Sequence, residues 1–253
     1  MGSEGEYSGA SDPHGGGVGS ARLSAGAPGR ICLFGEHQDY LGLPVIAAAI
    51  SLRISAEAEE AEDGLLTIEL PDIGESLVID PNAPQTYRTR RDYLRSAVAI
   101  LQRKGFRWSR GYRVRITGTI PINAGVSSSS ALVVMWLRFL AAISDEPAPM
   151  EAEELARLGH MAEVVEFGEP GGMMDHFCAA MGGLLLISTE APYSAERLTT
   201  PLDGIVLADS LEPKATIETL ARVRSEVGEG IRLIRERLPA FDLVRTIIAE
   251  ADD

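Results

Sequence analysis

Hydrophobic and polar positions alternate along several short stretches in the first half of the chain. Residues 51–59, 65–70 and 76–80 have a period of two and are bounded by glycine, proline or aspartate. This pattern is typical of half-buried strands. A further strand is expected at residues 112–116. The first half of the chain is therefore expected to be rich in β-structure.

Other stretches repeat every three to four residues, which predicts helices. Residues 90–104 follow this spacing and end before Gly105, a typical C-terminal stop signal. Further helices are expected at residues 127–144, 151–167, 173–181 and 215–236, and short buried strands at 183–188 and 204–209. The helix at 127–144 is apolar on nearly all sides and begins with hydroxyl residues suited to an N-cap. Interleaved strands and helices indicate an α/β or α+β class.

The composition supports a large buried core and restricts the partners. The chain has 253 residues, of which 45% are hydrophobic and 24% charged. Its 23 basic and 37 acidic residues give a net charge of −14, which repels nucleic acid and anionic membrane surfaces. A bound polyphosphate would need a local device such as a helix N-terminus, an amide nest or a metal ion. The longest apolar runs, residues 41–50 and 131–143, are too short to span a membrane.

The cysteines and the N-terminus indicate a cytoplasmic protein. Cys32 and Cys178 are far apart and flanked by apolar residues, so they support neither a disulfide framework nor a thiolate metal cluster. Residues 1–20 lack the basic and apolar regions of a signal peptide. We expect them to form a disordered tail, with an ordered domain beginning near residue 21.

The first stretch with candidate chemistry is PGRICLFGEHQDY, residues 28–40. It places charged and imidazole side chains beside an apolar strand, namely Arg30, Glu36, His37 and Asp39. Such donors and acceptors suit a ligand with several hydroxyls, as in a sugar. The alternative interpretation is a strand end followed by a solvated turn. His37 has no second histidine at metal-ligand spacing.

The second stretch is PINAGVSSSSAL, residues 121–132. Its small residues let the backbone approach an anion, and a helix beginning in the serines directs free amides toward a phosphate. Serine hydroxyls can also bind Mg²⁺. A glycine-containing loop with a serine N-cap is the alternative. Neither a Gly-Lys-Ser/Thr triplet nor GxGxxG occurs, which argues against P-loop, Rossmann and protein-kinase folds.

The third stretch covers residues 163–183 and contains EFGEPGGMMDHFCAAMGG. Asp175 lies among apolar residues, where a carboxylate is costly without a partner such as Arg30. The alternative makes Asp175 an ordinary helix cap. For His176 and Cys178 we prefer structural roles, as a polar edge and a core filler.

Together the three stretches resemble the GHMP small-molecule kinases, and within them the galactokinase branch. The first stretch is similar to the signature Pro-Gly-Arg, apolar strand, Gly-Glu-His, Asp-Tyr, and GVSSSSAL is similar to the family's Gly-Leu-Ser-Ser-Ser-Ala phosphate loop. In the third stretch the matching residues are Ala162, Glu163, Gly168, Pro170, Gly172, Met174 and Asp175. The resemblance spans roughly residues 22–209. Arginine at position 30 favours sugar kinases over mevalonate kinases, which usually carry lysine there.

The resemblance implies an α+β fold, an α/β sandwich of the ribosomal-S5-domain-2 type, in a GHMP kinase N-terminal domain over residues 21–200. Residues 201–253 would begin a ferredoxin-like C-terminal domain and leave it incomplete. The family's glycine-rich loop in that second domain is missing from the sequence. We therefore expect this chain to bind ATP weakly and to turn over slowly or not at all.

The resemblance also implies roles for individual residues. Asp175 is the expected base or orienting carboxylate, and Arg30 its partner and transition-state stabiliser. The sugar is expected to contact Glu36, His37, Asp39 and Gly172. ATP and its phosphates are expected to contact Gly125, Val126, Ser127, Ser128, Ser129 and, near the adenine, Tyr93. Ser129 and Glu163 are the expected Mg²⁺ ligands.

The leading hypothesis is an ATP- and Mg²⁺-dependent kinase for the C1 hydroxyl of galactose or a related monosaccharide. A mevalonate-type kinase is an alternative, because residues 41–50 resemble mevalonate kinases, and Arg30 and Asp39 discriminate between the two. Ala221 stands where galactokinases place a sugar-facing tyrosine, so a related sugar is an alternative to galactose itself. Asn123 and Ser130 also depart from the usual phosphate loop. A catalytically silent sugar-binding regulator is the third alternative, and the paired Arg30 and Asp175 argue against it.

Overall fold

Two long antiparallel strands, β1 (Leu23–Phe34) and β2 (Val45–Ala61), form the centre of the fold. The computed structural model describes residues 23–122, 124–147, 149–202, 204–208 and 216–243, so the tail expected at residues 1–20 lies outside the described residues. β2 pairs with β5 (Gly111–Gly118) along its second half and with β6 (Leu184–Ser188) along its first. β3 (Leu66–Leu70) runs parallel to β5, while β4 (Glu75–Ile79) and β7 (Ser194–Leu198) complete the ends. The sheet has seven strands in the order β4-β3-β5-β2-β6-β7, with β1 on β2.

The alternation in the strands separates the two faces of the sheet. Ala56, Ile68 and Val114 are buried on one face, whereas their neighbours Glu57 and Arg113 are exposed on the other. Successive side chains of a strand point to opposite faces, so the polar positions remain in water and the apolar positions face the helices. The strands predicted from the period of two are confirmed.

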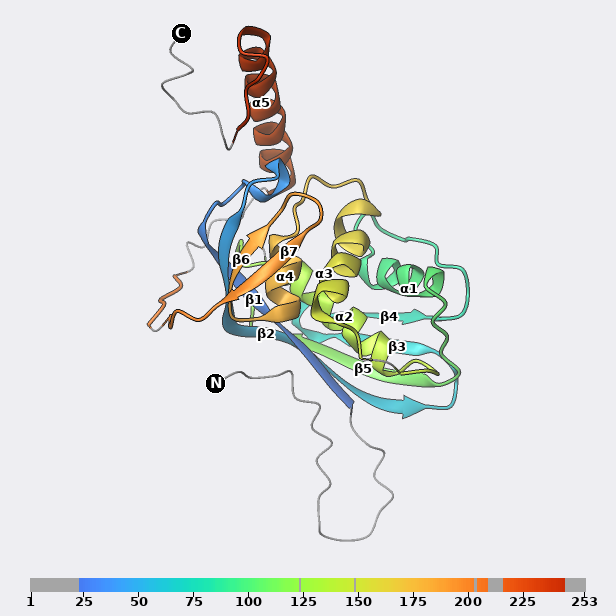
Figure 1. Ribbon diagram of the computed structural model, residues 1–253. Coiled ribbons are helices and arrows are strands. Elements are labelled where there is room, and N and C mark those ends of the chain that lie inside the picture. The colour runs from blue at the N-terminus through green and yellow to red at the C-terminus, as the bar shows by residue number, and fades with distance from the viewer. Residues whose placement is uncertain (1–22, 123, 148, 203, 209–215, 244–253) are drawn as a thin grey trace.

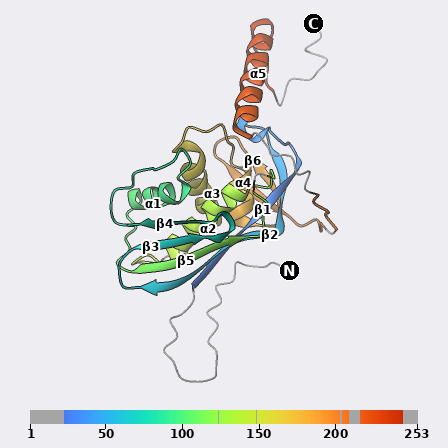
Figure 2. The same ribbon diagram turned by 180° about the vertical axis from the view of Figure 1, so that it is seen from behind.

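Helices cover the apolar face of the sheet (Figures 1 and 2). They are α1 (Tyr93–Arg103), α2 (Ser128–Ala142), α3 (Ala152–His160), its π-helical continuation η3 (Met161–Val165), and α4 (Met174–Met181). Short 3₁₀ turns occupy η1 (Asp39–Leu41) and η2 (Pro71–Ile73). α2 lies at the centre of the helical layer, and its Trp136 and Leu137 are fully buried, as its nearly uniform apolarity predicts.

The strand predicted at residues 204–209 is wrong. Residues 204–208 form no strand, Val206 is 90% exposed, and Asp209 lies outside the described residues. An apolar run becomes a strand only where a neighbour pairs with its backbone, and no described strand pairs with this one. Conversely, β7 was not predicted, because its sequence SAERL is polar and has little alternation.

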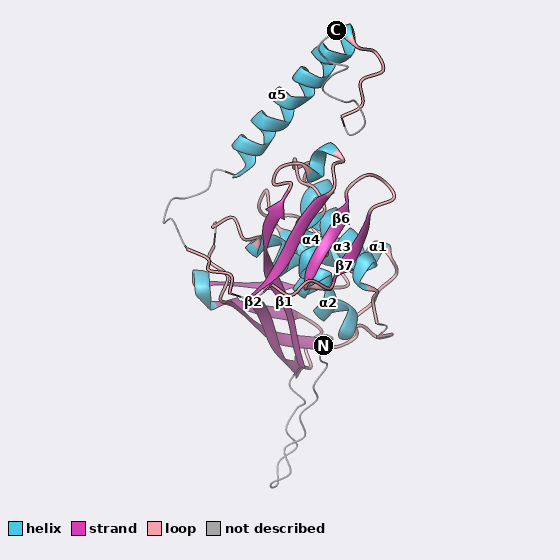
Figure 3. Cartoon of the chain, turned by 60° about the vertical axis from the view of Figure 1, so that its left-hand side comes forward, coloured by secondary structure: helices cyan, strands magenta, loops and turns pink. Residues whose placement is uncertain are grey.

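The helix predicted at residues 215–236 is observed as α5 (Thr216–Arg237), with Ala215 outside the described residues. Figure 3 shows α5 projecting away from the sandwich. Its Leu233 and Ile234 are 49% and 41% exposed. The assignment of residues 201–253 to a second domain remains a prediction. Within the described residues, no helix combines the length and apolar character that a membrane span requires.

Candidate functional site

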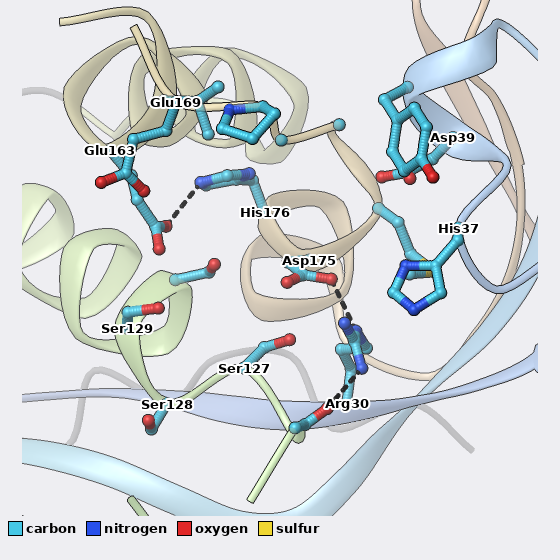
Figure 4. A pocket seen from close by; sticks show the side chains of 18 of the residues that line it. Arg30, His37, Asp39, Ser127, Ser128, Ser129, Glu163, Glu169, Asp175 and His176 are labelled. Carbon is cyan, nitrogen blue, oxygen red and sulfur yellow. Dashed lines mark hydrogen bonds and ion pairs between the residues drawn. The ribbon is translucent and has the colours of Figure 1, made fainter. Parts of the chain in front are cut away.

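Residues from all three candidate stretches line one cavity (Figure 4). The predicted residues that line it are Arg30, Glu36, His37, Asp39, Tyr93, Gly125, Ser127, Ser128, Ser129, Glu163, Gly172 and Asp175. Val126 does not line it. The Val126 side chain is buried in the core, and its carbonyl accepts a hydrogen bond of 3.2 Å from the Arg30 amide. Val126 therefore shapes the loop through its backbone.

Arg30 connects three parts of the cavity. It comes from β1, and its Nε donates to Asp175 Oδ1 in the first turn of α4 at 2.6 Å. Its second nitrogen donates to the Gly125 carbonyl in the loop before α2 at 2.9 Å. Arg30 is 7% exposed, so its charge is held in place and only weakly screened by water.

The pair fixes the charge state of Asp175. Burial alone raises the pKa of this carboxyl, but the charge and hydrogen bond of Arg30 outweigh burial and leave the pKa below its usual value. The pKa of Arg30 is raised, because attraction to Asp175 exceeds the cost of burial. At neutral pH the cavity therefore holds an ionised carboxylate beside a permanent cation.

Asp39 lies against Gly172 in the wall of the cavity. A Cβ on Gly172 would lie 2.0 Å from Asp39 Oδ2, so only glycine allows this approach. Burial, and then the negative charge of Asp175, raise the pKa of Asp39. The neighbouring His37 has a φ of 63°, an unusual backbone conformation for a residue with a side chain. The carboxyls of Asp39 and Asp175 and the imidazole of His37 thus line the same part of the cavity.

The loop before α2 has the features of an anion site. Ser127, the residue before α2, has a φ of 61° and a ψ of 47°. Its buried hydroxyl interacts with the Asp175 carboxylate and helps to lower the pKa of that carboxyl. Gly29 makes room for the loop, because a Cβ there would lie 2.7 Å from the Val126 carbonyl oxygen. The free amides at the start of α2 favour a bound phosphate.

Glu163 lies at the back of the cavity in the π-helical turn η3. It is 7% exposed and accepts a hydrogen bond of 2.8 Å from His176 Nε2. Burial raises the pKa of Glu163, but His176 and the hydroxyls of Ser129 and Ser130 outweigh it and lower the pKa. An anionic carboxylate beside serine hydroxyls is a donor set that fits Mg²⁺.

Mg²⁺ commonly binds one or two protein carboxylates and completes its shell with water and substrate phosphates. Within the described part of the chain, no group of three or more His, Cys, Asp and Glu residues could hold a metal ion.

Comparison with known proteins gives two matches that meet at this cavity. Residues 92–183 match the GHMP kinases N terminal domain, and residues 17–59 match the galactokinase galactose-binding signature. The chain belongs to the GHMP kinase family. The resemblance inferred from the three stretches is confirmed, and the cavity is formed by residues from both matched regions and by Arg91, which directly precedes the second region.

Individual relatives of this GHMP kinase chain include two kinds of kinase. The mevalonate kinase of Thermococcus sibiricus is 32% identical over 222 residues, 84% of this chain and 65% of that protein. The galactokinase of Lacticaseibacillus casei is 33% identical over 163 residues, 62% of this chain and 41% of that protein. The chain thus spans 41% to 65% of the length of these two relatives.

Solved structures show the same fold. The galactokinase of Lactococcus lactis, complexed with galactose, has a TM-score of 0.70 at 22% identity, covering 88% of this chain and 58% of that chain. The mevalonate kinase of Methanococcus jannaschii has a TM-score of 0.61 at 23% identity, covering 73% of this chain and 57% of that chain. The mixed α/β fold expected from the sequence is confirmed.

Nine residues that line the cavity of this GHMP kinase chain were not predicted as site residues, among them Tyr40, Arg91, Glu169 and His176. The interpretation of His176 as a polar edge is wrong, because it is 1% exposed and hydrogen-bonded to Glu163. The interpretation of Cys178 as a core filler is confirmed, since it is fully buried. A signal was available for His176: a glutamate in an apolar helix needs a buried partner, as Asp175 does.

Acid should destabilise the protein through His160. Burial, and then His176, lower the pKa of His160 to about 4, whereas an unfolded histidine titrates near 6.5. Below pH 6.5 the unfolded chain binds the additional proton, so the free energy of unfolding falls until about pH 4, by about 3 kcal/mol in total. Urea unfolding at pH 7, 5.5 and 4.5 measures this loss. His160→Gln should show a smaller loss, and equal losses would contradict the assignment.

Proposed function

We propose that the chain forms the nucleotide- and sugar-binding part of a kinase that transfers phosphate from ATP to the C1 hydroxyl of galactose or a related monosaccharide. The observation that carries this proposal is the shared cavity. The Asp39 carboxylate on Gly172 and the Arg30–Asp175 pair line it together. Asp39 and Arg30 also fall within residues 17–59, which match the galactose-binding signature.

In the proposed reaction Asp175 acts on the sugar and Arg30 on the transferred group. The lowered pKa of Asp175 keeps its carboxylate ready to orient the C1 hydroxyl and to receive its proton. Arg30 remains charged and offers a fixed cation to the phosphoryl oxygens. Phosphoryl transfer depends mainly on such positioning and charge neutralisation.

The nucleotide would occupy the side of the cavity formed by α1 and α2. Amides at the start of α2 and the serine hydroxyls that line this side of the cavity suit its phosphates. Tyr93, packed edge-on against Phe167 at a centroid distance of 5.6 Å, offers an aromatic surface for the base. Ser129 and Glu163 would hold Mg²⁺, which when bound neutralises charge on the phosphates.

The sugar assignment depends on Glu36, His37 and Asp39. Their donors and acceptors match a ligand with several neighbouring hydroxyls. A mevalonate-type kinase is the second candidate, favoured by the 222-residue match to the Thermococcus sibiricus mevalonate kinase. Mevalonate carries one carboxylate, and a pocket edged by Glu36 and Asp39 would repel it.

Asp39→Ala should raise the sugar KM by about 10- to 100-fold, because a hydrogen bond from a sugar hydroxyl to a carboxylate is lost. The ATP KM should stay within about twofold. A coupled ADP-release assay with each substrate varied in turn measures both constants. Glu57→Ala, on the exposed face of the sheet, is the control and should change neither. An equal rise in both constants would remove Asp39 from the sugar site.

A further inference from the structure

The first turn of α4 carries two adjacent polar residues that point to different parts of the cavity (Figure 4). Asp175 contacts Arg30 at 2.6 Å, and His176 contacts Glu163 at 2.8 Å. Neighbouring residues of a helix are rotated by about 100°, so one rigid turn can hold both contacts. A shift of α4 would therefore move the expected base and the partner of Glu163 together.

The His176–Glu163 contact is largely buried at the wall of the cavity. The two side chains are 2% and 9% exposed. A Cβ on Gly159 would lie 3.0 Å from His176 Cδ2, so this glycine gives the imidazole ring its place. The ring of His160 stands at 88° to that of His176, with centroids 5.5 Å apart. The imidazole is held in one orientation by packing.

Among the described residues, the imidazole of His176 has a hydrogen bond to Glu163 alone. Because Glu163 accepts the bond, His176 Nε2 carries the hydrogen. The buried Nδ1 has no hydrogen-bond partner in the described part of the chain. A buried nitrogen without a partner is costly, and an apolar side chain of similar volume would fill the space without that cost. The bond to Glu163 is thus the interaction that an imidazole, and not an apolar residue, provides here.

We propose that His176 is a positioning residue that fixes the Glu163 carboxylate toward Ser129, where the metal ion of the nucleotide binds. The inference rests on the proposed function. A carboxylate has two oxygens, and binding Oε2 to His176 limits the rotation of the carboxylate, which also accepts hydrogen bonds from Ser129 and Ser130 at the cavity. Groups that orient metal ligands in this way commonly affect metal affinity by 10- to 100-fold. Through α4, His176 also keeps the metal ligand in register with Asp175.

The test compares two substitutions of His176. In His176→Gln the side-chain amide nitrogen reaches the place of Nε2 and can donate to Glu163. In His176→Asn the side chain is too short to do so. Calorimetric titration with ADP, with and without Mg²⁺, measures the gain in affinity that Mg²⁺ provides. We expect the Mg²⁺-dependent gain in ADP affinity to be about tenfold smaller in His176→Asn than in wild type. In His176→Gln the same gain should stay within about threefold of wild type.

Two controls separate positioning from a structural role. His160→Gln alters the same ring cluster without touching Glu163, and it should leave the Mg²⁺-dependent gain unchanged. Sugar affinity, measured by titration with galactose, should be unchanged in all three variants. In a Glu163→Gln background, His176→Asn should cause no additional loss of the Mg²⁺-dependent gain, because the carboxylate that it positions is gone.

Several results would overturn the inference. They are an undiminished Mg²⁺-dependent gain in His176→Asn, a parallel fall in sugar affinity, or an additional loss in the Glu163→Gln background. If His176→Asn does not fold, His176→Gln decides: loss of the gain in this folded variant overturns the inference. If wild type binds ADP with no gain from Mg²⁺, the proposed metal site fails as well.

Discussion

Asp175→Asn is expected to lower kcat by about 10³-fold while the chain still folds, because the amide cannot accept the proton of the sugar hydroxyl. The asparagine oxygen can still accept the hydrogen bond from Arg30 Nε that is seen with Asp175. Kinetics and circular dichroism on the purified variant measure the two parts of this prediction. Asp145→Asn, which does not line the cavity, is the matched control. Turnover within about tenfold of wild type would contradict the role given to Asp175.

The second large effect is expected from Arg30→Met. Loss of the cation removes a stabilising charge from the transition state, which commonly costs about 10² to 10³ in kcat. It also leaves Asp175 with the effect of burial, which raises its pKa. The acidic limb of the pH–rate profile should therefore move to higher pH, since the ionised carboxylate is the active form.

Arg30→Lys provides the conservative comparison. Arg30 contacts both Asp175 and the Gly125 carbonyl, and an ammonium on a flexible stem cannot reproduce this fixed fork. We expect an intermediate loss of kcat with a smaller shift of the acidic limb. If Arg30→Met and wild type have the same pH–rate profile, Arg30 does not control the charge state of Asp175.

The sequence predicts the elements of this fold better than their pairing. Alternation identifies β3 and β4 nearly to the residue, because half-buried strands must separate polar and apolar side chains. The strand predicted at residues 204–209 is not observed over the described residues 204–208, because an apolar run indicates a tendency to be buried and not the presence of a pairing strand. β7 has the opposite problem: pairing with β6 makes it a strand although its own residues are mostly polar.

The sequence predicts a pair of site residues where a buried charge needs an opposite charge as its partner. Asp175 in an apolar helix indicated a cationic partner, and Arg30 is that partner although 145 positions separate them. Glu163 is a second buried carboxylate that needs a partner, and His176 is that partner. This pair was not predicted from the sequence. Arg91 and Glu169 form an ion pair of 2.7 Å across 78 positions, and nothing local in either segment indicates it. The close approach of Asp39 to Gly172 likewise depends on the tertiary fold.

The central claim is that this cavity delivers phosphate from ATP to the anomeric hydroxyl of a sugar. Because this chain alone is expected to turn over slowly or not at all, the most direct test uses a form extended past residue 253 to include the family's glycine-rich loop. That form is incubated with ATP, Mg²⁺ and galactose or a related monosaccharide, and the product is examined by ³¹P NMR. The account predicts a new phosphomonoester resonance coupled to the anomeric proton, absent with Asp175→Asn. A phosphomonoester formed from mevalonate but from none of the sugars would contradict it.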